Sequence, residues 1–443
     1  MIIKNLKINF YKSIKQSMDL SLDRVNIFIG QNNSGKSNIL DAIEFTLSEH
    51  SEDHTLYYEK SDIDITIEFT DQTQAKYKLP GKEGVLSLKG QQKHLNFPGA
   101  TLPDNKALTH MLSTHFKRLD TEAFTDFEQI EEDFQDLFNY PSQLDRFKEI
   151  LKHHFPKISA TKNALDIRYE NEGLYEGKRR VTIDRLGSGF QRIFTMLLYI
   201  FHPKYSIVMI GEPEIHLHPA IAKKLLWAMQ NSNAGQILFT THSPLFITPM
   251  TLPQVVRVTK HENTTQAFAL SQVKYNYKRL IQELNADNLE MFFTDEVVLV
   301  EGVSDKLLIR GLIDKFYQGD RAIKVIQAHG KGNVKIYADL LKIFKISFTV
   351  VLDKDAIKSN HLRELLRHLD IHMPPLNTED LIEQLKKYSI FILPNGDLEA
   401  NYPRKYQLGD SKSLNALHAA NLVSEKDFNS KVMENLKAII DNL

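Results

Sequence analysis

The eight residues GQNNSGKS at positions 30–37 decide the fold of the first part of this chain. An apolar stretch at residues 24–29 predicts a buried strand before them, and residues 38–43 predict a helix after them. A glycine-rich loop that joins a strand to a helix and ends in Lys-Ser is the arrangement of a phosphate-binding P-loop. The helix N-terminus and the loop N–H groups both favour an anion such as a triphosphate.

Each type of residue in this loop has a physical role in holding a nucleotide. The glycines let the backbone curl around the phosphates, Lys36 would reach the β- and γ-phosphates, and Ser37 would bind Mg²⁺. An ordinary turn before a helix is the alternative, and the flanking strand and helix disfavour it. We therefore predict that the chain binds ATP. The predicted contacts are Gly30, Asn33, Ser34, Gly35, Lys36 and Ser37.

The composition restricts the class of protein. A length of 443 residues predicts two or three domains with sizeable cores, and a net charge of −1 requires any nucleic-acid binding to use local basic patches. The chain has no cysteine, which excludes disulfides, zinc ribbons and cysteine-held iron–sulfur clusters and fits a reducing compartment. A signal-peptide pattern and an apolar run of about 20 residues are both absent, so we expect a cytoplasmic protein with no membrane partner.

A segment of about residues 104–160 separates the P-loop from later motifs, and we interpret it as a helical insertion. From residue 104 to residue 154 the pattern is helical and dense in charge. Aromatic residues at helical spacing belong more often to a core than to a cofactor site. Residues 62–69 alternate polar and apolar, which predicts a half-buried strand. The aromatic residues expected in the core of the insertion are Phe124, Phe127, Phe134 and Phe138.

Three later motifs support the nucleotide site. The run IVMIGEPE at residues 207–214 predicts a strand that ends beside Glu212, where a general base for an attacking water would lie. Ser188 and Gly189 precede a predicted helix and suit contact with a γ-phosphate through backbone N–H groups. His242 follows another predicted strand, in a position to sense that phosphate. Each motif alone has a plain structural explanation, but their order and spacing together favour a nucleotide site.

These motifs resemble those of ABC-type ATPases of the SMC and RecF kind, and the run EPEIHLHP at residues 212–219 resembles the OLD family. In that superfamily two heads enclose ATP between them, so the resemblance implies a homodimer or a higher homo-oligomer. ATP held by Lys36 of one copy would meet Ser188 and Gly189 of another. Gly211 departs from the pattern, because an acid that supports Mg²⁺ usually stands there. Slow hydrolysis and binding without hydrolysis therefore both stay open.

A second block of alternating strands and helices, residues 294–443, follows a connector at residues 271–293 and predicts an α/β domain with a parallel sheet. Glu301 ends one predicted strand, and Asp353 and Asp355 end a later one. The carboxyl ends of parallel strands lie at one edge of a sheet, so these acids are expected to converge. Clustered carboxylates repel unless a cation lies between them, and oxygen ligands favour Mg²⁺ or Mn²⁺.

This second block resembles the Toprim domain, with its Glu-Gly motif and its Asp-x-Asp motif at residues 353–355. The run LPNGDLE at residues 393–399 resembles a later acidic motif of OLD-family nucleases. The resemblance implies phosphodiester cleavage assisted by two metal ions, with Glu301, Asp353 and Asp355 as ligands. It further implies Asp305 and Glu399 for a second ion, and either Lys405 or Lys412 for the phosphate.

The sequence thus predicts an ABC-type P-loop ATPase domain at residues 1–270, with its helical insertion, and a Toprim domain at residues 294–443. The resemblance implies an ATP-binding, Mg²⁺- or Mn²⁺-dependent DNA endonuclease of OLD type, regulated by nucleotide and active in anti-phage defence. DNA and a partner defence protein are the expected partners. The alternative is a non-catalytic, ATP-gated scaffold or sensor subunit that works with a partner effector, to which Gly211 lends weight. Two other activities of Toprim proteins fit this sequence poorly. A bacterial-type primase needs a zinc module, which a chain without cysteine is poorly equipped to build. A topoisomerase needs a domain with a nucleophilic tyrosine, and we identify no such domain.

Overall fold

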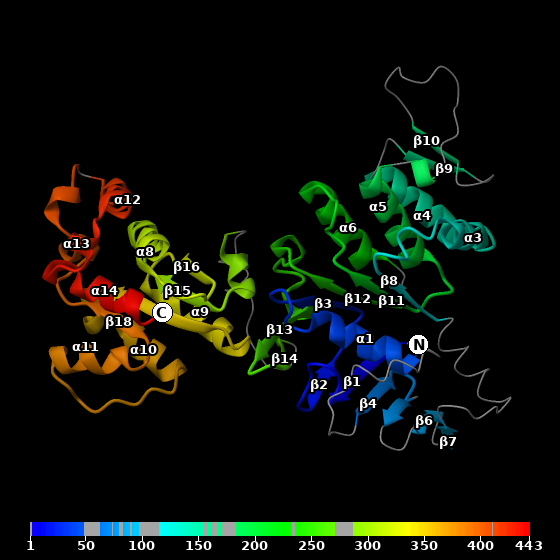
Figure 1. Ribbon diagram of the computed structural model, residues 1–443, viewed down its shortest axis with the longest axis horizontal. Helices are drawn as coiled ribbons and strands as arrows, with labels where there is room; N and C mark the ends of the chain where they lie inside the picture. Colours follow the sequence, from blue (N-terminus) through cyan, green and yellow to red (C-terminus); the bar gives the residue numbers. More distant parts are fainter. Residues whose placement is uncertain are drawn as a thin grey trace. The chain divides into compact units, whose positions relative to one another are not determined.

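The computed structural model (Figure 1) divides into two compact units, Met1–Gln272 and Val273–Leu443. No helix in the described ranges has the length and apolar character that a membrane crossing requires. The structure describes residues 2–47, 63–72, 74–78, 83–88, 91–96, 115–154, 158–161, 166–169, 183–185, 187–232, 235–270, 287–409 and 411–443.

The first unit is built on a six-stranded sheet of order β14-β13-β3-β12-β11-β8. All neighbouring strands are parallel except β13 and β14, which form an antiparallel pair. Strands β3 and β12 are buried along their whole length, as expected for central strands of a parallel sheet. The strands are β3 (Val25–Ile29), β8 (Phe116–Leu119), β11 (Ile207–Gly211), β12 (Gln236–Thr241), β13 (Val255–His261) and β14 (Thr264–Ala269).

Helix α1 (Lys36–Leu47) lies between this sheet and a second, antiparallel sheet of order β2-β1-β4-β5-β6-β7. One continuous apolar core joins α1 to both sheets. Strand β4 alternates between half-buried and buried residues, which confirms the predicted half-buried strand. The strands are β1 (Ile3–Asn9), β2 (Met18–Ser21), β4 (Asp64–Phe69), β5 (Gln74–Lys78), β6 (Glu83–Leu88) and β7 (Gln91–Asn96).

Among its described residues, the first unit has four further α-helices and a small hairpin. Aromatic rings join three of the helices, since the ring of Phe194 lies 5.2 Å from that of Phe134 and 5.6 Å from that of Phe147. The elements are α3 (Phe127–Leu137), α4 (Pro141–His154), α5 (Ser188–Phe201), α6 (Pro219–Asn231), β9 (Ile158–Thr161) and β10 (Asp166–Tyr169).

Strand β8 lies inside the stretch that we expected to be helical. Its residues pair with β11 at the edge of the central sheet. A four-residue strand with two charged residues has no clear period-two pattern, so the helical interpretation failed there. Helices α3 and α4 do form, and Phe124 and Phe134 are buried as expected. Residues 104–114 and 155–157 of the expected insertion lie outside the described residues.

Asp133 is a buried acid at the centre of this helical region. Its carboxylate accepts hydrogen bonds from the hydroxyl groups of Tyr199 at 2.8 Å and Tyr205 at 3.0 Å. The ammonium groups of Lys117 and Lys204 lie 3.8 and 3.7 Å from the same carboxylate. This one side chain therefore satisfies polar groups from three separate segments.

We expect Asp133→Ala to lower the free energy of unfolding of the first unit by about 3 kcal/mol, because it leaves two buried hydroxyls and two cations without their acceptor. Urea unfolding followed by the fluorescence of Trp227, the single tryptophan, measures this loss. Glu131→Ala, at an exposed position of the same helix, is the control and should change stability by less than about 0.5 kcal/mol. Equal losses in both variants would contradict the role of Asp133.

The second unit contains a four-stranded parallel sheet of order β16-β15-β17-β18. Strands β15, β16 and β17 and the helices between them confirm the predicted alternation of strands and helices. Strand β18 and the helices after β17 were not predicted. Residues of α8, α12 and α14 form one core with the sheet. The elements are β15 (Glu296–Val300), α8 (Val303–Phe316), β16 (Ile323–Gln327), α9 (Lys331–Ile343), β17 (Ser347–Asp353), α10 (Asn360–His368), α11 (Thr378–Lys386), β18 (Ile390–Leu393), α12 (Lys412–Leu422), α13 (Glu425–Phe428) and α14 (Glu434–Asp441).

Candidate nucleotide and metal sites

The loop between β3 and α1 is tightly enclosed at both of its glycines. Gly30 has φ +150° and a Cβ there would lie 2.1 Å from the carbonyl oxygen of Val258. Gly35 has φ +99° and a Cβ there would lie 2.2 Å from the hydroxyl of Thr265. Asn33 also adopts a positive φ, of 61°. Only glycine fits the first two positions, so the backbone has the sharp curl that a P-loop needs.

Lys36 at the start of α1 is folded back onto this loop. Its ammonium group donates hydrogen bonds to the carbonyl oxygens of Gly30 at 3.1 Å and Gln31 at 2.9 Å. Burial lowers the pKa of Lys36 to about 8, against the opposing effect of Glu212 and Glu214. A phosphate would offer this ammonium a stronger, charged acceptor than two carbonyl groups.

The parallel order of the sheet brings Glu212 and His242 to the edge where the P-loop begins. Strand β12 lies between β3 and β11, so the segments that follow all three strands are neighbours. The carboxylate of Glu212 lies 3.2 Å from Nε2 of His242, and its backbone has φ +47°. Burial and the charge of Lys36 lower the pKa of His242, so the imidazole is neutral at pH 7.

Two residues at this edge were not among the predicted contacts. Glu214 accepts hydrogen bonds from the hydroxyl of Thr241 at 2.7 Å and from the backbone N–H of His242 at 2.8 Å. Arg192 on α5 is buried and donates to the carbonyl oxygen of Glu212 at 3.2 Å. Glu214 belongs to the motif at residues 207–214, but only the fold shows which acid of that motif contacts the turn after β12. No motif or spacing in the sequence indicates that Arg192 contacts this site.

The predicted signature residues Ser188 and Gly189 form the first turn of α5. Ser188 is exposed, and a Cβ on Gly189 would lie 2.7 Å from the carbonyl oxygen of His216. The start of α5 therefore lies against the loop that follows Glu212. In the same loop His218 caps α6 through a hydrogen bond from Ala220, which is a structural role.

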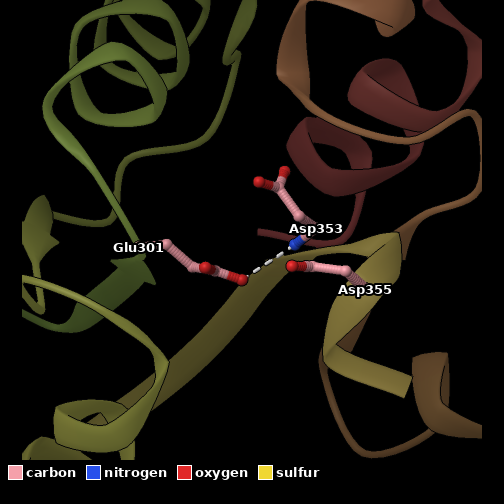
Figure 2. A group of neighbouring side chains, drawn as sticks. All are labelled: Glu301, Asp353 and Asp355. Atoms are coloured by element: carbon pink, nitrogen blue, oxygen red, sulfur yellow. Dashed lines mark hydrogen bonds between the residues drawn. The ribbon is translucent and has the colours of Figure 1, made fainter. Parts of the chain in front are cut away.

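In the second unit, one oxygen from each of Glu301, Asp353 and Asp355 lies within 4.8 Å of the others. Figure 2 shows Glu301 and Asp355 pointing toward each other. Glu301 follows β15 directly, and Asp355 lies in the helical turn Lys354–Lys358 after the neighbouring strand β17. The backbone N–H of Asp353 donates to Glu301 at 3.0 Å, which fixes the two strand ends together. The structure thus brings the three predicted acids into one group.

The electrostatics of this group favour a cation. Burial raises the pKa of Glu301 to about 7, and burial together with Asp305 and Asp355 raises the pKa of Asp353 to about 6. A divalent ion between carboxyl groups whose pKa values are raised in this way stabilises their ionised form. The donor set consists of carboxylate oxygens, which fits Mg²⁺ or Mn²⁺.

Two of these acids, Glu301 and Asp353, also line a cavity of about 310 Å³, together with Asp305, Asp397, Glu399 and Lys412. Asp305 caps α8 by accepting a hydrogen bond from the N–H of Gly302 at 2.8 Å. The ammonium of Lys412 lies 2.8 Å from Asp397 and 3.4 Å from Glu399. The predicted residues Asp305, Glu399 and Lys412 therefore share one cavity.

The two candidate lysines differ in position. Lys405 is exposed and binds both carboxylate oxygens of Asp427 at 2.8 Å, away from the lining residues of the cavity, whereas Lys412 is one of those residues. A third lysine, Lys331, was not predicted. It forms an ion pair with Asp355 and lies 3.9 Å from Glu301. Its position at the start of α9, just beyond the loop after β16, a neighbour of β15, was the available signal.

The raised pKa values predict that metal affinity at this group depends on pH. Protons compete with the metal for Glu301 and Asp353, so affinity should rise through the range between their pKa values and level off above about 7. Calorimetric titration with Mn²⁺ should give an affinity at least about tenfold weaker near pH 5.5 than near pH 8. Affinity that is constant over this range would contradict the assignment.

Three family models match successive segments of the chain. The model "AAA ATPase domain" matches residues 1–97, and "AAA domain, putative AbiEii toxin, Type IV TA system" matches residues 95–248. The model "Overcoming lysogenization defect protein-like, TOPRIM domain" matches residues 292–355. The chain joins an AAA-type ATPase domain to an OLD-like Toprim domain. The predicted fold class, a P-loop ATPase followed by a Toprim domain, is therefore confirmed.

Curated relatives of this ATPase–Toprim chain carry the names of nucleases. The OLD nuclease of Thermus scotoductus is 26% identical over 211 residues, 44% of this chain and 39% of the relative. The endonuclease GajA of Bacillus cereus is 23% identical over 258 residues, 47% of this chain and 37% of the relative. The matches therefore span about two fifths of these relatives. Among solved structures, the SMC head domain from Thermotoga maritima matches with a TM-score of 0.40 at 16% identity, covering 62% of this chain and 100% of that chain.

Proposed function

We propose that this chain is an ATP-binding DNA endonuclease of OLD type that depends on Mg²⁺ or Mn²⁺. The observation that carries the proposal is the convergence of Glu301, Asp353 and Asp355 at one edge of the Toprim sheet. The names of the similar proteins support cleavage of nucleic acid as the reaction. A role in anti-phage defence, with a defence protein as partner, is part of the same proposal.

The residues around the cavity have separate roles in this proposal. A bound divalent ion supplies an activated water and stabilises the leaving oxygen of a phosphodiester. Glu301, Asp353 and Asp355 would hold one ion, and Asp305 and Glu399 border the cavity where a second would be held. The exposed ammonium of Lys412, which also lines the cavity, would orient the phosphate.

Nucleotide would regulate this site through the first unit. Lys36 and Ser37 would bind the phosphates and Mg²⁺, and the carboxylate of Glu212 would position a water with help from His242. Ser188 is exposed on the first turn of a 14-residue helix, as a contact to the nucleotide of a second copy requires. We therefore propose a homodimer or higher homo-oligomer as the working form.

Supercoiled plasmid incubated with the purified chain tests the proposal. We expect nicked or linear product with Mg²⁺ or Mn²⁺, no product with a chelator, and a rate that changes when ATP or a non-hydrolysable analogue is added. No product with either ion, with and without nucleotide, would contradict the nuclease proposal.

A second candidate function is an ATP-gated scaffold or sensor subunit without nuclease activity. Gly211 favours it, because the last residue of β11 offers no carboxylate to support Mg²⁺. Light scattering with and without ATP distinguishes the two candidates when it is combined with the plasmid assay. ATP-dependent assembly without cleavage would favour the scaffold.

A further inference from the structure

Lys331 is held at the metal-binding edge of the Toprim sheet by the backbone around it. It is the first residue of α9 and follows Gly330, which has φ +111°. The N–H of Gly330 donates to the carbonyl oxygen of Glu301 at 3.1 Å, which ties the loop after β16 to the loop after β15. Gly330 also lines the cavity. The fold therefore places a lysine beside the three carboxylates.

The ammonium of Lys331 contacts two members of the carboxylate group. It forms an ion pair with Oδ1 of Asp355, and it lies 3.9 Å from Oε2 of Glu301. The side chains of Lys331 and Glu301 are 21% and 13% exposed, whereas that of Asp355 is 71% exposed. A divalent ion bound by the same oxygens would meet this positive charge at short range.

The other lysines nearby have different acids as partners. Lys412 is paired with Asp397 and Glu399. Lys335, one helical turn beyond Lys331, is paired with Glu364 of α10. Among the residues that the structure describes, Lys331 is thus the lysine paired with Glu301 and Asp355.

We propose that Lys331 is the counterion of the Toprim carboxylates in the ion-free protein and competes with the divalent ion for Asp355. Metal binding then releases this ammonium from the carboxylate and makes it available to a phosphate of the substrate. The inference rests on the proposed function, because it takes the divalent ion and a nucleic-acid substrate from it. Lys331 would thus pair with Asp355 in the ion-free protein and with a substrate phosphate in the protein that holds the ion.

Mn²⁺ titration of Lys331→Gln tests the competition without any measurement of activity. Removing a unit charge beside a divalent ion should raise Mn²⁺ affinity about tenfold over that of the wild type. Lys335→Gln removes the same charge one helical turn away and should change affinity less than about twofold at about 0.15 M salt. Lys331→Arg keeps the charge and should stay near the wild type. An unchanged or weaker affinity in Lys331→Gln would overturn the competition.

Binding of an oligonucleotide in the presence of Ca²⁺ tests the second half of the inference. Lys331→Gln should bind this DNA more weakly than the wild type, although it binds the ion more tightly. Equal or tighter DNA binding would overturn the proposed phosphate contact. Wild-type protein that binds no Mn²⁺ would refute the proposed function itself. Wild-type protein that binds Mn²⁺ and cleaves DNA, with an unchanged Lys331→Gln affinity, would refute only the competition.

Discussion

Asp353→Asn is expected to reduce plasmid cleavage by at least about 100-fold. Changing a residue that only orients a metal ligand already lowers metal affinity or activity about 10–100-fold, and Asp353 is itself a proposed ligand. Asparagine keeps the volume and the backbone N–H that holds Glu301 at 3.0 Å, and removes only the charged ligand. ATP affinity should not change, since Asp353 belongs to the second compact unit. The rate of supercoil loss with Mg²⁺ and Mn²⁺ measures the effect.

Asp320→Asn is the matched control for this experiment. Asp320 is an exposed acid of the same unit, and its substitution should leave the cleavage rate near that of the wild type. Cleavage that persists at the wild-type rate in Asp353→Asn would show that this carboxylate does not take part in the reaction.

Lys36→Met is expected to weaken ATP binding at least about 100-fold, since it removes charge-assisted hydrogen bonds to two phosphates. Methionine keeps most of the buried stem, and the loop loses only the bonds from the ammonium to Gly30 and Gln31. Fluorescence of a labelled ATP analogue measures the affinity. Mn²⁺ affinity at the Toprim carboxylates should be unchanged.

Lys7→Ala, at an exposed position of β1, is the control for the loss of a lysine from the first unit. Its ATP affinity should match that of the wild type. Tight ATP binding by Lys36→Met would mean that residues 30–37 are not the nucleotide site.

The parts of the fold that could be predicted from the sequence are those with a strong local pattern. The P-loop has fixed residues between an apolar strand and a helix, and the alternation from β15 to β17 is regular. Convergence of Glu301 with Asp353 follows from a topological rule, because both residues stand at the carboxyl ends of parallel strands. These predictions needed no knowledge of long-range packing.

The remaining features depend on contacts between distant segments, which a local pattern does not encode. Strand β8 gains its conformation from pairing with β11, whose residues come 91 positions later than their partners in the chain. The choice between Lys405 and Lys412 depends on how the turns after β18 place α12. Arg192 contacts Glu212 only because α5 packs beside β11. No spacing in the sequence marks these residues.

Anomalous diffraction from crystals grown with Mn²⁺ tests the central claim most directly. We predict a Mn²⁺ peak about 2.0–2.4 Å from one carboxylate oxygen of each of Glu301, Asp353 and Asp355, within the range of oxygen-ligated divalent ions. The same peak should be lost in Asp353→Asn crystals. Crystals in which Mn²⁺ binds elsewhere, with these three carboxylates free of metal, would contradict the assignment of the site.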